Sequence, residues 1–150
     1  MKSGLILLMV ISLVFVMSWF IGSKLQQQDE VLFQAMIISP CQPVDRKCNA
    51  MFSDAVLQFE LSTPVVMKPF VAKIITHVEV SEIYLQFRMK NMDMGVQRYR
   101  LVNDGNGLWW SEAVLPVCSL GRSDWIATLE VKYQDTWWRG EFDFEVVSNE

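Results

Sequence analysis

Three stretches of this chain alternate between apolar and polar residues with a period of two. In residues 82–89, 125–133 and 140–147, every second side chain is apolar, and the intervening ones are mostly polar or charged. Successive side chains of a β-strand point to opposite faces, so this period is typical of strands with one buried face. The pattern therefore predicts antiparallel strands around an apolar core, and it disfavours an amphipathic helix over these residues.

Further strand-like segments complete the pattern. They cover residues 56–62, 69–77, 97–102 and 107–115, with turn residues at 103–107 (NDGNG) and at 134–135. About seven short strands in about 100 residues, without a helical stretch between them, are typical of a small sandwich. We therefore expect an all-β, immunoglobulin-like antiparallel β-sandwich. Three tryptophans are expected in its core: Trp109, Trp125 and Trp138.

An uncharged apolar run precedes these strands. Residues 4–22 carry no charge and are bounded by Lys2 and Lys24, and a membrane-spanning helix needs about 20 apolar residues. We expect one N-terminal transmembrane helix in an anchor over residues 1–24, a connector over 25–40 and the sandwich over 41–150. The alternative is a cleaved signal peptide, although its apolar part is normally shorter and is followed by a small-x-small cleavage site.

The cysteines indicate the compartment of the domain. Cys41 and Cys48 flank a short loop, and Cys118 lies later in the chain. Disulfides persist in oxidising compartments, so these residues favour an extracytoplasmic domain. We favour a disulfide between Cys118 and one of the upstream pair, because it would clamp the connector onto the domain. A local Cys41–Cys48 disulfide and a Cu(I)-binding dithiol are the alternatives.

Charge and motif content restrict the function. The net charge is −4 and no Lys/Arg cluster occurs, which argues against nucleic-acid binding. The chain has one histidine and no GxSxG, HExxH or P-loop motif, so we do not expect an enzyme. The acids Glu130, Glu141 and Asp143 occupy outward-facing strand positions, and we interpret them as a solvated face.

A methionine-containing loop is the candidate metal site. Met92 and Met94 precede Gly95, and in an extended loop their thioethers project to the same side. Thioethers are soft ligands that suit Cu(I), with Met67 or His77 as a possible third ligand. The alternative is that these methionines fill gaps or contact a partner.

Two arginines follow this loop. Arg98 and Arg100 lie on the polar face of the next expected strand. They are candidates to bind a carboxylate of a partner, and solvated strand positions are the alternative.

Several runs resemble known families. The runs MDMGVQRYRL (92–101), DGNGLWWSEAVLPVC (104–118) and GRSDWIATLEV (121–131) are similar to the FixH and YtkA-like families, and the resemblance covers most of residues 40–147. These are short bacterial proteins with an N-terminal transmembrane helix and an extracytoplasmic β-sandwich. The resemblance implies an inner-membrane protein with a periplasmic domain that takes part in respiratory-oxidase assembly and copper supply.

The expected function is therefore that of a non-enzymatic, single-pass accessory protein. Its partners would be an oxidase assembly factor or an oxidase subunit, and copper(I) would be its only candidate cofactor. One alternative is a metal-free interaction module that stabilises a membrane complex. Another is a thiol–disulfide participant that uses Cys41 and Cys48.

Overall fold

The computed structural model describes residues 11–19, 31–92, 95, 97–117 and 121–146. The chain divides into two compact units, Met1–Val31 and Leu32–Glu150. In the first unit, residues 11–19 are helical. Among the described residues, no helix combines the length and the apolar composition needed to cross a membrane. Most of the predicted anchor, and residues 25–30 of the predicted connector, lie outside the described residues.

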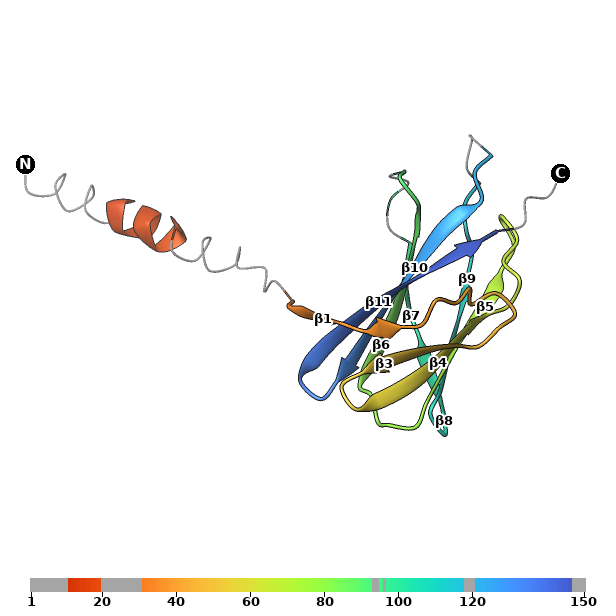
Figure 1. Cartoon of the computed structure of the whole chain (residues 1–150). Helices are drawn as coiled ribbons and strands as arrows, with labels where there is room; N and C mark the ends of the chain where they lie inside the picture. The colour runs from red at the N-terminus through yellow and green to blue at the C-terminus, as the bar shows by residue number, and fades with distance from the viewer. Residues whose placement is uncertain (1–10, 20–30, 93–94, 96, 118–120, 147–150) are drawn as a thin grey trace, which may run out of the picture. The chain divides into compact units, whose positions relative to one another are not determined.

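The second unit consists of two sheets (Figure 1). The first sheet has, in spatial order, β1 (Phe33–Ala35), β11 (Thr136–Glu145), β10 (Asp124–Tyr133), β6 (Glu82–Met89) and β7 (Gln97–Arg100). The second has β2 (Ile37–Ile38), β3 (Cys48–Phe52), β4 (Ala55–Leu61), β5 (Phe70–Thr76), β9 (Leu108–Ala113) and β8 (Val102–Gly105). The predicted all-β sandwich is confirmed.

The domain begins earlier than the sequence predicted. Residues 32–40, which we expected to be connector, belong to the compact unit because β1 pairs in parallel with β11 and β2 pairs with β3. The side chain of Met36, between these two short strands, is buried. The apolar stretch before Pro40 thus forms the point at which the chain passes from one sheet to the other.

Aromatic side chains fill the space between the sheets. The rings of Phe59 and Phe142 lie 4.9 Å apart, and those of Phe70 and Phe87 lie 5.5 Å apart. Such tilted and edge-on pairs are the favoured geometry for buried aromatic rings. Of the three tryptophans predicted in the core, Trp109 and Trp125 are buried, and Trp138 is half-buried against the core.

The strand directions define two ends of the sandwich. Strand β5 runs into the connection 77–81 at one end, and β6 then returns to residues 90–92 at the other (Figure 1). We call these the histidine end and the methionine end, after His77 and Met92. The eight residues of β6 separate them by about 23 Å at about 3.3 Å per residue.

A glycine at the histidine end allows the turn between β8 and β9 to approach the end of β5. Gly107 has φ of +76°, and its carbonyl accepts a hydrogen bond of 3.0 Å from Thr76 N–H. A Cβ built there would lie 1.9 Å from the carbonyl oxygen of Thr76. Gly105 has φ of +90° but open space around it. Only glycine therefore satisfies both the backbone angle and the contact at position 107.

We predict that Gly107→Ala lowers the free energy of unfolding by about 2–5 kcal/mol, because left-handed strain adds to a backbone clash. The matched change Gly105→Ala retains the strain without the clash and should cost about 1–2 kcal/mol. Urea unfolding of both variants would measure the difference. Equal losses would contradict the contact with Thr76.

Candidate functional site

The structure separates the candidate metal ligands. Met92 follows β6 at the methionine end, where its half-buried side chain packs against the core. His77 lies at the opposite end, the length of β6 away. The structure therefore does not bring His77 to Met92, because the two residues flank the same strand. Met94 lies outside the described residues.

Met67 is the candidate third ligand that shares an end with Met92. It lies in the connection between β4 and β5, its side chain is exposed, and its N–H donates a hydrogen bond of 2.9 Å to the carbonyl of Leu115. Within the described part of the chain, no group of three or more His, Cys, Asp or Glu residues is placed to hold a metal ion. The thioethers of Met67 and Met92 are the predicted soft ligands that lie at this end.

His77 lines a small polar hollow at its own end. The hollow has a volume of about 310 Å³, and Glu79, Asn103 and Asn106 also line it. Beside it, Val78 N–H donates a hydrogen bond of 3.3 Å to the hydroxyl of Thr76. The histidine therefore belongs to a polar turn region rather than to the methionine loop.

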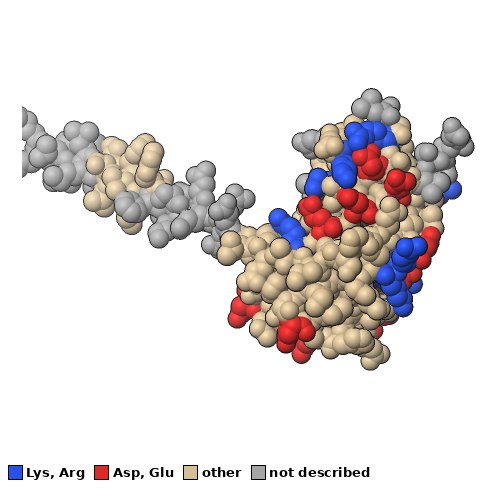
Figure 2. Space-filling view, in the orientation of Figure 1, with Lys and Arg blue, Asp and Glu red and all other residues tan. Residues whose placement is uncertain are grey.

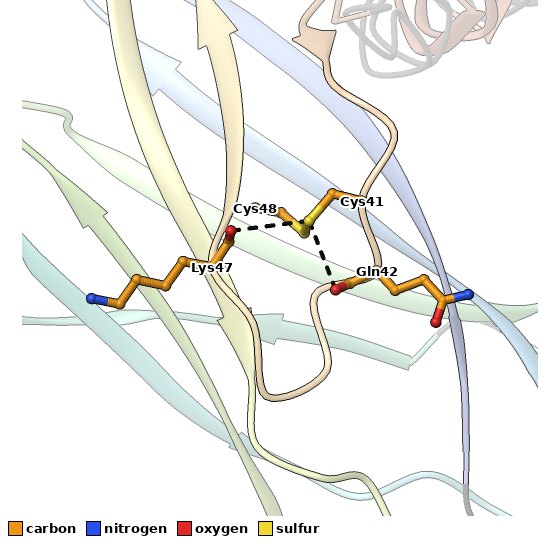
Figure 3. The surroundings of a disulfide bond; sticks show 4 residues. All are labelled: Cys41, Gln42, Lys47 and Cys48. Carbon is orange, nitrogen blue, oxygen red and sulfur yellow. Dashed lines mark hydrogen bonds between the residues drawn. A yellow bond between two sulfur atoms is a disulfide. The ribbon is translucent and has the colours of Figure 1, made fainter.

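The disulfide is the local one. Cys41 and Cys48 are bonded, with Cα atoms 5.7 Å apart (Figure 3). The alternative of a Cys41–Cys48 pair is confirmed, and the favoured pairing of Cys118 with one of them is wrong. The reason is local: the chain turns back between Pro40 and β3, which brings the two residues together. Cys118 itself lies outside the described residues.

The disulfide and a short bridge hold the connecting loop against the second sheet. Val44 pairs with Leu61 at the end of β4, and Asp45 N–H donates a hydrogen bond of 2.8 Å to the carbonyl of Leu61. Cys41 Sγ lies 3.8 Å from the carbonyl oxygen of Gln42 and 4.0 Å from that of Lys47 (Figure 3). A disulfide sulfur carries no proton, so these are polar contacts without a donated hydrogen.

We predict that Cys41→Ser/Cys48→Ser lowers the free energy of unfolding by about 2.5 kcal/mol, the loop-closure value for a sequence separation of 7. Urea unfolding would measure it, with Cys118→Ser as the control that keeps the disulfide. Peptide mapping without reductant should recover the 41–48 linkage. A linkage to Cys118 would contradict the observed pairing.

The outer face of the first sheet holds a buried carboxylate. The side chain of Glu130, on the central strand β10, is 1% exposed. Its Oε1 accepts hydrogen bonds from Gln86 Nε2 (3.1 Å) and an Arg139 Nη (2.8 Å), and its Oε2 accepts one from an Arg98 Nη (3.0 Å). Our interpretation of Glu130 as a solvated acid is therefore wrong, because long side chains of the neighbouring strands cover it.

Aromatic rings surround this carboxylate. The guanidinium of Arg98 lies 4.0 Å from the ring centre of Tyr84, and that of Arg139 lies 3.6 Å from the ring centre of Phe33. Trp137 links the two aromatic side chains, at 5.9 Å from Tyr84 and 6.1 Å from Phe33. We call this closed arrangement the Glu130 ring, consisting of Glu130, Arg98, Arg139, Tyr84, Trp137 and Phe33. Cation–π contacts of this kind add to the ion pairs.

Most other charges on this face are also paired within the chain. Arg88 contacts Glu141 and Lys90 contacts Asp143, each at 3.2 Å. Figure 2 shows acidic and basic side chains gathered in the upper part of the visible face. At the start of β10, hydrogen bonds from the Arg122 guanidinium lower the pKa of the Asp124 carboxyl. These half-exposed pairs contribute little stability each.

The two arginines predicted to contact a partner differ in their surroundings. Arg98 belongs to the Glu130 ring, so its charge is already compensated by the chain itself. Arg100 is more exposed, with a guanidinium nitrogen 4.0 Å from a carboxylate oxygen of Glu82. Of the two side chains, that of Arg100 has more surface available to a partner.

We predict that Arg139→Met lowers the free energy of unfolding by about 1–3 kcal/mol, because the buried carboxylate of Glu130 loses a partner while the stem over Phe33 is kept. The reciprocal change Glu130→Gln should cost less, since water can reach the half-exposed guanidinium groups of Arg98 and Arg139. Urea unfolding compares the two variants. A larger loss of unfolding free energy for Glu130→Gln than for Arg139→Met would contradict the proposed roles of these residues in the ring.

The outer face of the second sheet carries exposed apolar side chains. Ile37, Met51 and Val56 lie side by side on β2, β3 and β4, and Trp110 and Val102 pair on β9 and β8. The half-buried Ile75 and Leu108, paired on β5 and β9, lie between these two groups. We call these seven residues the apolar face. In Figure 2 the area over β3 carries no charged side chain.

Comparison with family models, curated proteins and solved structures found no match to this chain.

Proposed function

We propose that this chain is a non-enzymatic, membrane-anchored accessory protein whose periplasmic domain acts by protein contact during assembly of a respiratory oxidase. The observation that carries the contact role is the apolar face, since adjoining exposed apolar side chains mark interaction sites. The resemblance to the FixH and YtkA-like families suggests the oxidase. The uncharged run at 4–22 supports the anchor.

The disulfide and the strand order support the location and the fold class. A Cys41–Cys48 disulfide suits an oxidising compartment such as the bacterial periplasm. The four-strand order β4-β5-β9-β8 opposite β11-β10-β6-β7 corresponds to the A-B-E-D and G-F-C-C′ sheets of immunoglobulin-like domains. We therefore assign the domain to an immunoglobulin-like topology as part of this proposal.

Copper supply to the same oxidase is the second candidate function. It is favoured by the position of Met67 and Met92 at one end of the sandwich, since thioethers are suitable Cu(I) ligands in a compartment where thiols are oxidised. In this version of the proposal, the methionine end carries the ion and the apolar face positions the domain on its partner.

One complementation experiment compares the two functions. A strain without this chain would receive the wild type, Val102→Lys/Trp110→Lys, or Met92→Leu/Met94→Leu, and oxidase activity of its membranes would be measured. We predict that the lysine variant lowers activity at least about tenfold, the effect of about 1.4 kcal/mol of binding energy. The control Gln134→Lys adds a charge in the exposed turn between β10 and β11, outside the apolar face, and should restore activity.

The outcomes of this experiment distinguish the contact function from copper supply. Loss with the leucine variant alone would favour copper supply, and an anaerobic Cu(I) titration of the full chain in detergent would then show binding that the leucine variant lacks. Full activity in the strain without the chain would overturn the oxidase proposal for both candidates.

A further inference from the structure

One edge of the first sheet is only partly covered. β1 pairs with β11 at Trp137, Trp138 and Arg139 and then leaves for the second sheet. Beyond that point, no strand among the described residues pairs with residues 141–145 on the side away from β10. This half of β11 is a free strand edge, at the methionine end of the sandwich.

The direction of the backbone groups follows from two hydrogen bonds. Val146 N–H donates to Ser123 on the β10 side, whereas the carbonyl of Arg139 accepts from Met36 on the opposite side. Backbone groups alternate sides along a strand. The N–H and C=O groups of Glu141, Asp143 and Glu145 therefore point away from β10, toward the free edge.

A groove runs along this edge. It has a volume of about 630 Å³ and lies between β11 and the loop that contains Cys41. The disulfide and the Val44–Leu61 bridge hold this loop on the second sheet, so it does not pair with β11. The lining is mixed: Ile38, Val44 and Phe142 are its apolar part, and Arg46 of the loop also lines it. The basic residues of a partner therefore belong on the outer face, beside the carboxylates of β11, and not in the groove. Its volume is within the range of ligand-binding sites.

We propose that this groove binds an extended segment of a partner protein, which adds a strand to β11 and alternates basic with apolar residues. The segment would hydrogen-bond to the outward backbone groups of Glu141, Asp143 and Glu145. Its apolar side chains would face the groove, and its basic side chains would lie beside the three carboxylates on the outer face. This inference rests on the proposed contact function and names the chemistry of the partner.

The carboxylates disfavour a second copy of the chain as the occupant. Pairing of two β11 edges would bring two rows of three acids together, and like charges opposite one another destabilise strand pairs. Arg88 compensates Glu141, and Lys90 compensates Asp143, each from across β10. Half or more of each carboxylate side chain remains exposed. Basic residues of an added strand can therefore reach them from the free side.

The first test uses the unmodified full chain in detergent micelles. The probe is a synthetic peptide in which lysine alternates with valine, and amide hydrogen exchange is followed residue by residue. Alone, the chain should exchange the amides of Asp143 and Glu145 at least about a hundredfold faster than those of Phe142 and Phe144. Peptide should slow Asp143 and Glu145 at least about tenfold. Unchanged exchange with saturating peptide would overturn the proposal.

The second test compares two variants of one residue by fluorescence anisotropy of the labelled peptide. Asp143→Pro and Asp143→Ala both remove the charge, but only proline removes the outward N–H, at an edge position where proline is tolerated. Asp143→Pro should bind at least about tenfold more weakly than Asp143→Ala. Equal affinity, or equal binding of a peptide with glutamate in place of lysine, would contradict strand addition by a basic segment.

Two further readouts separate the remaining explanations. A dimer of the wild-type chain that Asp143→Pro dissociates would overturn the partner segment in favour of a second copy. The oxidase activity restored by Asp143→Pro is also compared with that restored by Val102→Lys/Trp110→Lys. The first variant tests the free edge of β11, and the second tests the apolar face. If peptide does not bind but the lysine variant still abolishes oxidase activity, this inference fails and the proposed function stands.

Discussion

A buried carboxylate fixes how four strands of the first sheet align. Glu130 on β10 is removed from water, so its two oxygens need donors from the protein itself. β6 supplies Gln86, β7 supplies Arg98 and β11 supplies Arg139. A shift of any one of these strands by one residue would turn its donor to the other face and leave the charge short of a partner. The ring thus favours one register over its alternatives, in addition to the aromatic core on the opposite face.

The short first strands determine what the domain exposes. β1 covers β11 only as far as Arg139, and the chain then passes to the second sheet through the buried Met36. The Cys41–Cys48 disulfide and the pairing of Val44 with Leu61 retain the following loop there. A longer β1 would have paired with Glu141 and Asp143 and closed the edge. The free edge is therefore a consequence of where the chain changes sheets.

The alternation of apolar residues predicted the strands well, because one buried face imposes a period of two. It named no strand over β1, β2 or β3, and it predicted a turn over residues 103–107, where most of β8 lies. β1 and β2 lie in an apolar stretch without alternation and form by pairing with β11 and β3. The burial of Glu130 was not predicted, for a related reason. Its outward position is correct, but its burial depends on strand order, which places arginines of β7 and β11 around β10. His77 was predicted as a possible third metal ligand beside Met92, whereas β6 separates the two residues.

The acids along the free edge act differently on different partners. Exposed strand edges pair readily with other edges, and charged residues are a common protection against such pairing. Here Glu141, Asp143 and Glu145 repel the same edge of a second copy, while their outward backbone groups remain accessible. The same carboxylates attract the basic side chains of an added strand. One row of carboxylates can therefore both limit self-association and select the partner, because specificity is the difference between two binding free energies.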